Sequence, residues 1–311
     1  MTAPRESTPQ DGFEVLGALV LQVAEGARSL LESEGLLPLA NGSIMRELQV
    51  EPQFAAPDPW GSDPIMAARD FASTAFFAAT DHMKAFAASV FTRSPFAPFV
   101  TARAGLEACA VSDYLAEQGI APSERVRRIV NERLLDIHDN QHVARNLANP
   151  GPPELAGALA DMVDRVTALT TIATTLGFTV IAGNERTAYS LDKRRPTATA
   201  LIRRLFPQEL GLMLYHVLSA PSHSRPGGLL RSAAVGSVSP VSPLVANITL
   251  TGRDVTFLTS ACLLALGQTA RSLIAMNGWN SSEWDRLHIN ALQIAQVARK
   301  QEWSDYPSPR V

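Results

Sequence analysis

Three hydrogen-bonding side chains recur at four-residue spacing near the middle of the chain: Tyr215, Ser219 and His223. On an α-helix this spacing places all three on one face. The segment 210–214 before them is apolar, and two glycines follow them. The pattern predicts a polar pocket at the end of an apolar helix within a helical bundle, with Arg225 nearby to hold an anionic group.

A serine and a histidine four residues apart can also act as a nucleophile and its base. However, no nucleophile elbow surrounds Ser219, and Pro221 is expected to bend the last helical turn. Two interpretations therefore stay open for this face: a ligand-binding pocket, or a hydrogen-bonded packing cluster that closes the end of the helix.

Arg103 and Glu107 form a second candidate pair, four residues apart in a segment otherwise built from Phe, Val, Ala, Leu and Cys. Tyr114 continues the same helical face. Charged groups on an apolar helix need a partner or access to a water-filled cleft. The pair is therefore interpreted either as a ligand-holding pair or as an internal structural salt bridge.

The helix expected to begin at Ser123 is dense in charge. Most of its charged residues are expected on a solvated face, with pairs such as Glu124 with Arg128. Within it Arg133 precedes His138 by five residues. An arginine can hold a phosphate while a histidine moves a proton, so this pair is the candidate catalytic site of a metal-independent ribonuclease.

His138 and His142 also have a spacing that allows two imidazoles to share a metal ion. Asp139 stands where the zinc proteases that use this spacing have a catalytic glutamate, and the sequence offers no evident third ligand. We therefore predict no metal site and no cofactor.

The composition indicates a folded chain, because 46% of its 311 residues are hydrophobic and the net charge is only −3. A generally basic nucleic-acid binder is disfavoured by this charge. Cys109 and Cys262 lie in apolar contexts and are expected to be buried thiols of a reducing compartment. The first residues lack a secretory signal, and the long uncharged run 166–184 is interpreted as a buried core helix, which predicts a cytoplasmic protein without a membrane segment.

Hydrophobic periodicity predicts an all-α fold, an antiparallel helical bundle with extra N- and C-terminal helices. A single domain is expected over 13–303, with the bundle core at about 64–300, a disordered tail at 1–12 and a further tail at 304–311. The segment 35–63 is interpreted as a surface connection, and 235–251 as a minor strand pair or extended segment. The expected helices span 12–33, 64–93, 96–118, 123–149, 154–181, 197–222 (one helix or two split at Pro207), 254–276 and 281–303.

Several short runs are shared, in order, with a known group of proteins. They are Asp81-His82-Met83-Lys84 and the segments 102–108, 124–128, 131–134, 196–199 and 214–219, together with His223. Over roughly residues 64–300 the chain resembles a group of uncharacterised all-helical proteins from actinobacteria. This resemblance implies an all-α fold and no particular activity.

A more distant resemblance is to the bundles of the higher-eukaryote-and-prokaryote nucleotide-binding (HEPN) superfamily. Many of its members cleave RNA or act in phage defence, and others only bind or dimerise. Its nuclease motif is an arginine, usually a polar residue, three further residues and a histidine. Arg133 and His138 have this spacing, but Leu134 stands at the polar position. The resemblance implies a HEPN-like ribonuclease or toxin as one alternative.

The leading hypothesis from the sequence is a cytoplasmic helical module that binds a nucleotide, an RNA or a protein partner, including a second copy of itself. The binding residues would be Arg103, Glu107, Tyr215, Ser219, His223 and Arg225. The alternatives are the ribonuclease that uses Arg133 and His138, and an interaction protein whose polar residues are purely structural.

Overall fold

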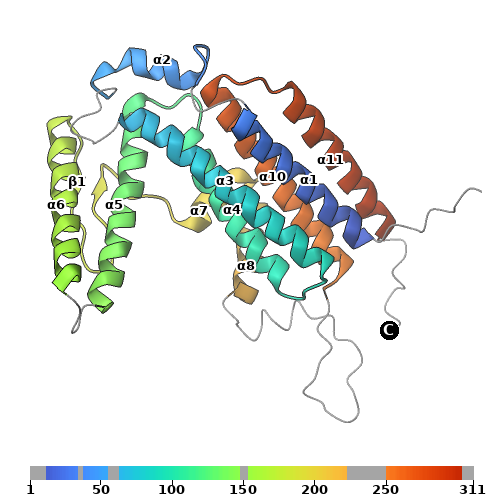
Figure 1. Ribbon diagram of the computed structural model, residues 1–311. Coiled ribbons are helices and arrows are strands. Elements are labelled where there is room, and N and C mark those ends of the chain that lie inside the picture. The colour runs from blue at the N-terminus through green and yellow to red at the C-terminus, as the bar shows by residue number, and fades with distance from the viewer. Residues whose placement is uncertain (1–11, 34–37, 55–62, 148–152, 223–249, 303–311) are drawn as a thin grey trace, which may run out of the picture.

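The computed structural model describes residues 12–33, 38–54, 63–147, 153–222 and 250–302, and these residues are almost entirely helical (Figure 1). The predicted all-α class is confirmed. The elements are α1 (Gly12–Ser33), α2 (Ser43–Val50), a 3₁₀ turn η1 (Pro52–Phe54), α3 (Pro64–Phe91), α4 (Ala97–Ala116), α5 (Pro122–Leu147), α6 (Pro153–Thr175), β1 (Val180–Ile181), β2 (Ser190–Leu191), α7 (Ala198–Leu205), α8 (Gln208–Ser222), α10 (Gly252–Asn277) and α11 (Ser282–Glu302).

The central bundle consists of α1, α3, α4, α10 and α11, which lie side by side in Figure 1. The most extensive contact joins α3 to α4, which a five-residue connection holds antiparallel. The seam is built from fully buried side chains such as Phe76, Phe86 and Leu106. Burial of this apolar surface is the main favourable term in the folding of the bundle.

The remaining helices pack around this bundle. Figure 1 places α2 across the top, α7 and α8 against α4, and α5 with α6 on the opposite side from α11. The antiparallel β1–β2 pair lies beside α5 and α6. Asn131 of α5 holds β2 in place, because its Oδ1 accepts the Leu191 N–H at 2.7 Å and its Nδ2 donates to the Lys193 carbonyl at 3.0 Å.

The helix expected over 154–181 is present as α6, but the expectation that the run 166–184 forms a buried core helix is wrong. Helix α6 ends at Thr175, and most of its side chains are half-buried or exposed. Gly177, with φ +89°, lets the chain turn toward β1. The threonine hydroxyls of α6, including those of Thr170 and Thr174, bond to carbonyls of their own helix. These internal bonds satisfy the hydroxyl groups of a largely uncharged helix, so the absence of charge did not signal burial.

The segment interpreted as a surface connection contains α2 and η1, and Ile44 and Phe54, the apolar anchors that the sequence offers there, are buried in the core. The split of 197–222 into two helices at Pro207 is confirmed. The predicted tails 1–12 and 304–311 lie outside the described residues, apart from Gly12, which begins α1. The predicted extended segment 235–251 does as well, apart from Leu250 and the α10 N-cap Thr251.

Within the described ranges, α10 is the one helix long and apolar enough to span a membrane, and 67% of its most apolar window is buried inside the bundle. It packs against α1, α3, α4 and α11. Cys109 of α4 and Cys262 of α10 are both buried free thiols. Burial raises the pKa of the Cys109 thiol to about 12, which keeps this thiol protonated and unreactive.

Candidate functional site

Helix α4 presents the first half of the predicted polar cluster. The Nε of Arg103 donates to a carboxylate oxygen of Glu107 at 2.8 Å, and the two side chains are 17% and 34% exposed. The guanidinium carbon of Arg103 lies 5.4 Å from the centroid of the Tyr215 ring on α8, a cation–π distance. The pair therefore faces α8 at the edge of the bundle, where solvent reaches it.

Tyr215 of α8 is the centre of the part of the polar cluster that α7 and α8 contribute. Its phenolic group interacts with the side chains of Thr199 on α7 and Ser219 on α8, whose hydroxyl is buried. These interactions, together with the positive charge of Arg103, lower the pKa of Tyr215. Tyr215 therefore differs from a fully solvated tyrosine in having a lowered pKa and a guanidinium beside its ring.

The structure thus brings together four of the six predicted binding residues: Arg103, Glu107, Tyr215 and Ser219. His223 and Arg225 lie outside the described residues. Thr199 of α7 also belongs to this group, and it was not predicted from the sequence. The available signal was its place in the first turn of that helix, directly after the Thr197 N-cap. We call Arg103, Glu107, Thr199, Tyr215 and Ser219 the Tyr215 cluster.

The predicted ribonuclease pair lies elsewhere, on α5. A separation of five residues places two side chains about 140° apart around a helix. Burial, together with the nearby positive charge of Arg165 on α6, lowers the pKa of Arg133. The imidazole Nε2 of His138 lies 3.2 Å from the Asn184 carbonyl in the turn between β1 and β2. The five-residue spacing therefore sets the two side chains apart around α5, and the His138 imidazole contacts the hairpin turn.

His142, the other member of the possible metal pair, is exposed. Among the residues that the structure describes, no group of three or more His, Cys, Asp or Glu side chains could hold a metal ion.

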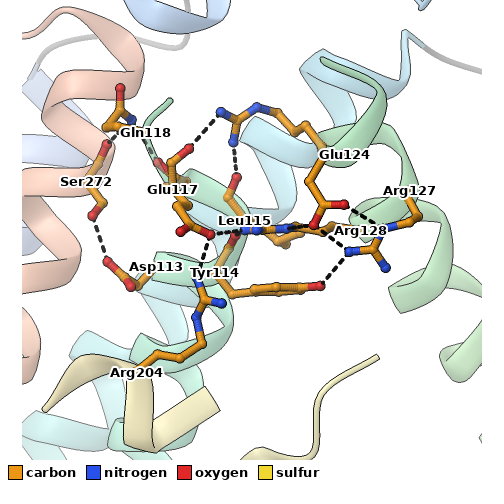
Figure 2. A network of polar contacts seen from close by, with 12 residues as sticks. Asp113, Tyr114, Leu115, Glu117, Gln118, Glu124, Arg127, Arg128, Arg204 and Ser272 are labelled. Atoms are coloured by element: carbon orange, nitrogen blue, oxygen red, sulfur yellow. Dashed lines mark hydrogen bonds and ion pairs between the residues drawn. The ribbon is translucent and has the colours of Figure 1, made fainter. Parts of the chain in front are cut away.

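A larger polar network joins α4 to the start of α5 (Figure 2). At its core Arg125 is fully buried and makes a bidentate ion pair with Glu47 of α2, at 2.5 Å and 2.6 Å. The same guanidinium donates to the Leu115 carbonyl and, at 2.9 Å, to the Glu117 carbonyl. Arg125 thereby satisfies carbonyl groups at the C-terminus of α4 that have no partner within the helix.

Tyr114 lies between two further guanidinium groups of this network. The guanidinium carbon of Arg128 is 4.2 Å from its ring centroid and that of Arg204 is 5.3 Å away. Both arginines pair with the Glu117 carboxylate, and Arg128 also donates to the Tyr114 carbonyl. These positive charges complement the negative end of the α4 dipole.

The interpretation of this part of α5 as a solvated face is wrong. The predicted Glu124–Arg128 pair is present at 2.8 Å, but Arg125, Arg127 and Arg128 are all buried. They are buried because α5 begins directly against the end of α4, where carbonyl groups and the carboxylates of Glu47 and Glu117 compensate the charge. The charged groups of this network are all paired with one another or with carbonyl groups. We therefore interpret it as a structural junction between α2, α4 and α5.

Glu124 makes the junction sensitive to acid. Burial on its own would raise the pKa of Glu124, but hydrogen bonds and positive charge from Arg127 and Arg128 outweigh it and lower the pKa to about 2. A carboxylate with a depressed pKa stabilises the fold above its ordinary value of 4.5, and this contribution is lost as the pH falls toward 2.

We therefore expect Glu124→Gln to lower the free energy of unfolding at pH 7 and to make the loss of stability between pH 4.5 and pH 2 less steep than in the wild type. Urea unfolding across this pH range measures both effects. Glu32→Gln, which alters an exposed ion pair with Arg28, is the matched control and should leave the curve nearly unchanged. Parallel curves for Glu124→Gln and the wild type would contradict the assignment.

Comparisons of the chain with models of protein families, with curated proteins and with solved structures find no match.

Proposed function

We propose that this protein is a cytoplasmic helical module that binds a nucleotide through the Tyr215 cluster. The observation that carries the proposal is the convergence of α4, α7 and α8 on one half-exposed phenol, whose hydroxyl meets two other hydroxyls and whose ring lies beside a guanidinium. Perturbed titratable groups at a solvent-accessible meeting point of several elements are a feature of ligand sites.

The chemistry of the cluster fits a phosphorylated ligand that carries a ring. A guanidinium has five N–H donors in a planar fork, so the same group can hold a carboxylate and a phosphate oxygen together. Glu107 orients the Arg103 side chain through the 2.8 Å ion pair. The ring of Tyr215 offers a stacking surface for a base, and the hydroxyl of Thr199 can bond to a sugar.

A mononucleotide fits this cluster better than a long RNA does. Binding of a single strand requires a basic groove with several aromatic platforms. Two of the arginines that could line such a groove are already neutralised, since Arg195 pairs with Glu132 at 2.5 Å and Arg204 pairs with Glu117 at 2.5 Å.

Calorimetric titration tests the proposal, with nucleoside mono-, di- and triphosphates in one arm and a short RNA oligonucleotide in the other. We expect Arg103→Ala to weaken nucleotide binding by about 10- to 100-fold, the loss of one hydrogen bond from a charged group. Tyr215→Phe removes a neutral hydroxyl and should weaken binding by about fivefold.

Arg28→Ala is the matched control. Like Arg103, Arg28 pairs with a glutamate four residues later at 2.8 Å and lies over an aromatic ring, that of Phe77 at 4.4 Å, but it does so away from the cluster. This variant should bind as the wild type does. No nucleotide binding by the wild type, or equal affinity for Arg103→Ala, would contradict the proposal. A fall in thermal stability for Arg103→Ala far beyond that for Arg28→Ala, without any change in binding, would favour a structural salt bridge instead.

A further inference from the structure

His288 is a titratable group buried in the contact between α11 and α10, away from the Tyr215 cluster. Its side chain is 1% exposed. The imidazole lies against Gly267 of α10, where a Cβ atom would come within 2.1 Å of the ring. On its other side it stacks on Trp284, with ring centroids 5.7 Å apart and planes 9° from parallel. The glycine of α10 and the indole of α11 thus form a slot that fits a flat ring.

Both ring nitrogens of His288 have partners, and those partners require the neutral form. Nε2 lies 2.9 Å from the Leu263 carbonyl oxygen, which can only accept, so Nε2 carries a proton. Nδ1 lies 3.3 Å from Nη2 of Arg271, which can only donate, so Nδ1 must offer its lone pair. A proton added to Nδ1 would place two donors and two positive charges face to face.

The other charged groups around this slot do not remove the repulsion between a protonated His288 and Arg271. Arg271 of α10 disfavours the imidazolium, and Asp285 of α11 favours it. The Asp285 carboxylate is itself 3.6 Å from Nε of Arg271. The α1 residues that line the pocket beside Trp284 are uncharged: Gly26, Ser29, Leu30 and Ser33. Glu283 and Arg286 of α11 line the same pocket and carry opposite charges. Burial, with the hydrogen bond to Leu263 opposing it and the charge of Arg271 assisting it, lowers the pKa of His288 below its ordinary value of 6.5.

From this geometry we infer that His288 is a proton-sensitive latch, which holds α11 on α10 near neutral pH and releases it in mild acid. The direction of the pH dependence follows from the linkage between proton binding and the release of α11. The attached helix binds the proton less well than the released helix does, so release takes up a proton and becomes more favourable as the pH falls below about 6.5. Stacking on Trp284 can offset part of the cost of the imidazolium charge, but it cannot restore the hydrogen bond from Arg271.

Hydrogen exchange measured by mass spectrometry at pH 7.5, 6.5 and 5.5, with intrinsic exchange rates corrected, tests the latch on the full chain. Peptides from 282–298 should open more often in acid, with an opening constant that rises by at most about tenfold per pH unit below 6.5. Peptides from α3 and α4 are the internal reference and should change far less.

His288→Gln keeps a donor for the Leu263 carbonyl and an acceptor for Arg271 but cannot be protonated. Its α11 peptides should show the same opening constant at all three pH values. His142→Gln replaces an exposed histidine of α5 and should retain the pH dependence of the wild type.

A second measurement does not depend on how well the glutamine variant folds. Titration of the His288 Cε1–H resonance by NMR should give a pKa below 6.5 in the wild type and a higher pKa in Arg271→Gln, because the opposing donor and charge are removed. Equal protection of α11 at pH 7.5 and 5.5 in the wild type would overturn the latch. So would a His288→Gln variant that keeps the pH dependence of the wild type, or an Arg271→Gln variant with an unchanged histidine titration.

Discussion

Arg125→Met will lower the free energy of unfolding by about 3–5 kcal/mol, as expected when one partner of a buried ion pair is removed. Arg125 is fully buried, and its loss leaves the Glu47 carboxylate, itself 8% exposed, without its bidentate partner. It also removes the donors to the Leu115 and Glu117 carbonyls at the end of α4. Urea unfolding at pH 7, monitored by circular dichroism, measures the loss.

Two further variants give this prediction its controls. Arg125→Met combined with Glu47→Leu removes both charges, so the double variant should lose clearly less stability than the sum of the two single variants. Arg28→Ala, which breaks a solvent-exposed pair, should cost at most about 1 kcal/mol. A loss below about 1 kcal/mol for Arg125→Met would show that the junction between α2, α4 and α5 does not depend on this ion pair.

Gly278→Ala is expected to cost about 2–5 kcal/mol, because two independent penalties coincide at one position. Gly278 ends α10 with φ +75°, a left-handed conformation that costs a non-glycine residue about 1–2 kcal/mol. A Cβ at this position would also lie 2.6 Å from the Gly42 backbone nitrogen and 2.3 Å from Oδ1 of Asn41. The close backbone approach holds the start of α2 against the end of α10, and overpacking there adds about 1–3 kcal/mol.

The variant Gly119→Ala distinguishes the conformational penalty from the overpacking penalty. Gly119 has nearly the same backbone conformation, φ +74°, but no atom of a neighbouring group would lie within 4 Å of a Cβ at this position. Gly119→Ala should therefore cost only the conformational term of about 1–2 kcal/mol. The difference between the two variants in thermal or urea unfolding measures the contact between α2 and α10. Equal losses at both positions would mean that the Asn41–Gly42 turn moves away without cost.

The long periodic helices could be predicted because their signals are local. The α1 range 12–33 was expected as observed, and α3, α4, α10 and α11 were placed within about two residues of their ends. The expected burial of 166–184 was wrong because an uncharged stretch is compatible with burial or with a threonine-rich exposed helix, and only the packing of neighbours distinguishes these cases. Likewise, no local signal predicted that α2 would bring Glu47 to Arg125 across 78 residues.

For the candidate site, four-residue spacing was enough to pair Arg103 with Glu107 and Tyr215 with Ser219, since both relations lie within one helix. The contact between α4 and α8 and the arrival of Thr199 from α7 depend on how three helices pack. The spacing of Arg133 and His138 suggested a catalytic pair; on one helix it sets the side chains about 140° apart, and the pair stays a prediction.

The sequence by itself determined the all-α class, most helix boundaries and the intrahelical pairs, because these follow from periodicity, capping and neighbours three or four residues apart. Only the tertiary structure decided which charges are buried. The arginines after Ser123 have the same local pattern as a solvated face, and they became a junction because α5 starts against the last carbonyls of α4. The same holds for His288, whose single protonation state is imposed by a carbonyl and a guanidinium of α10 that lie 25 and 17 residues away in the chain.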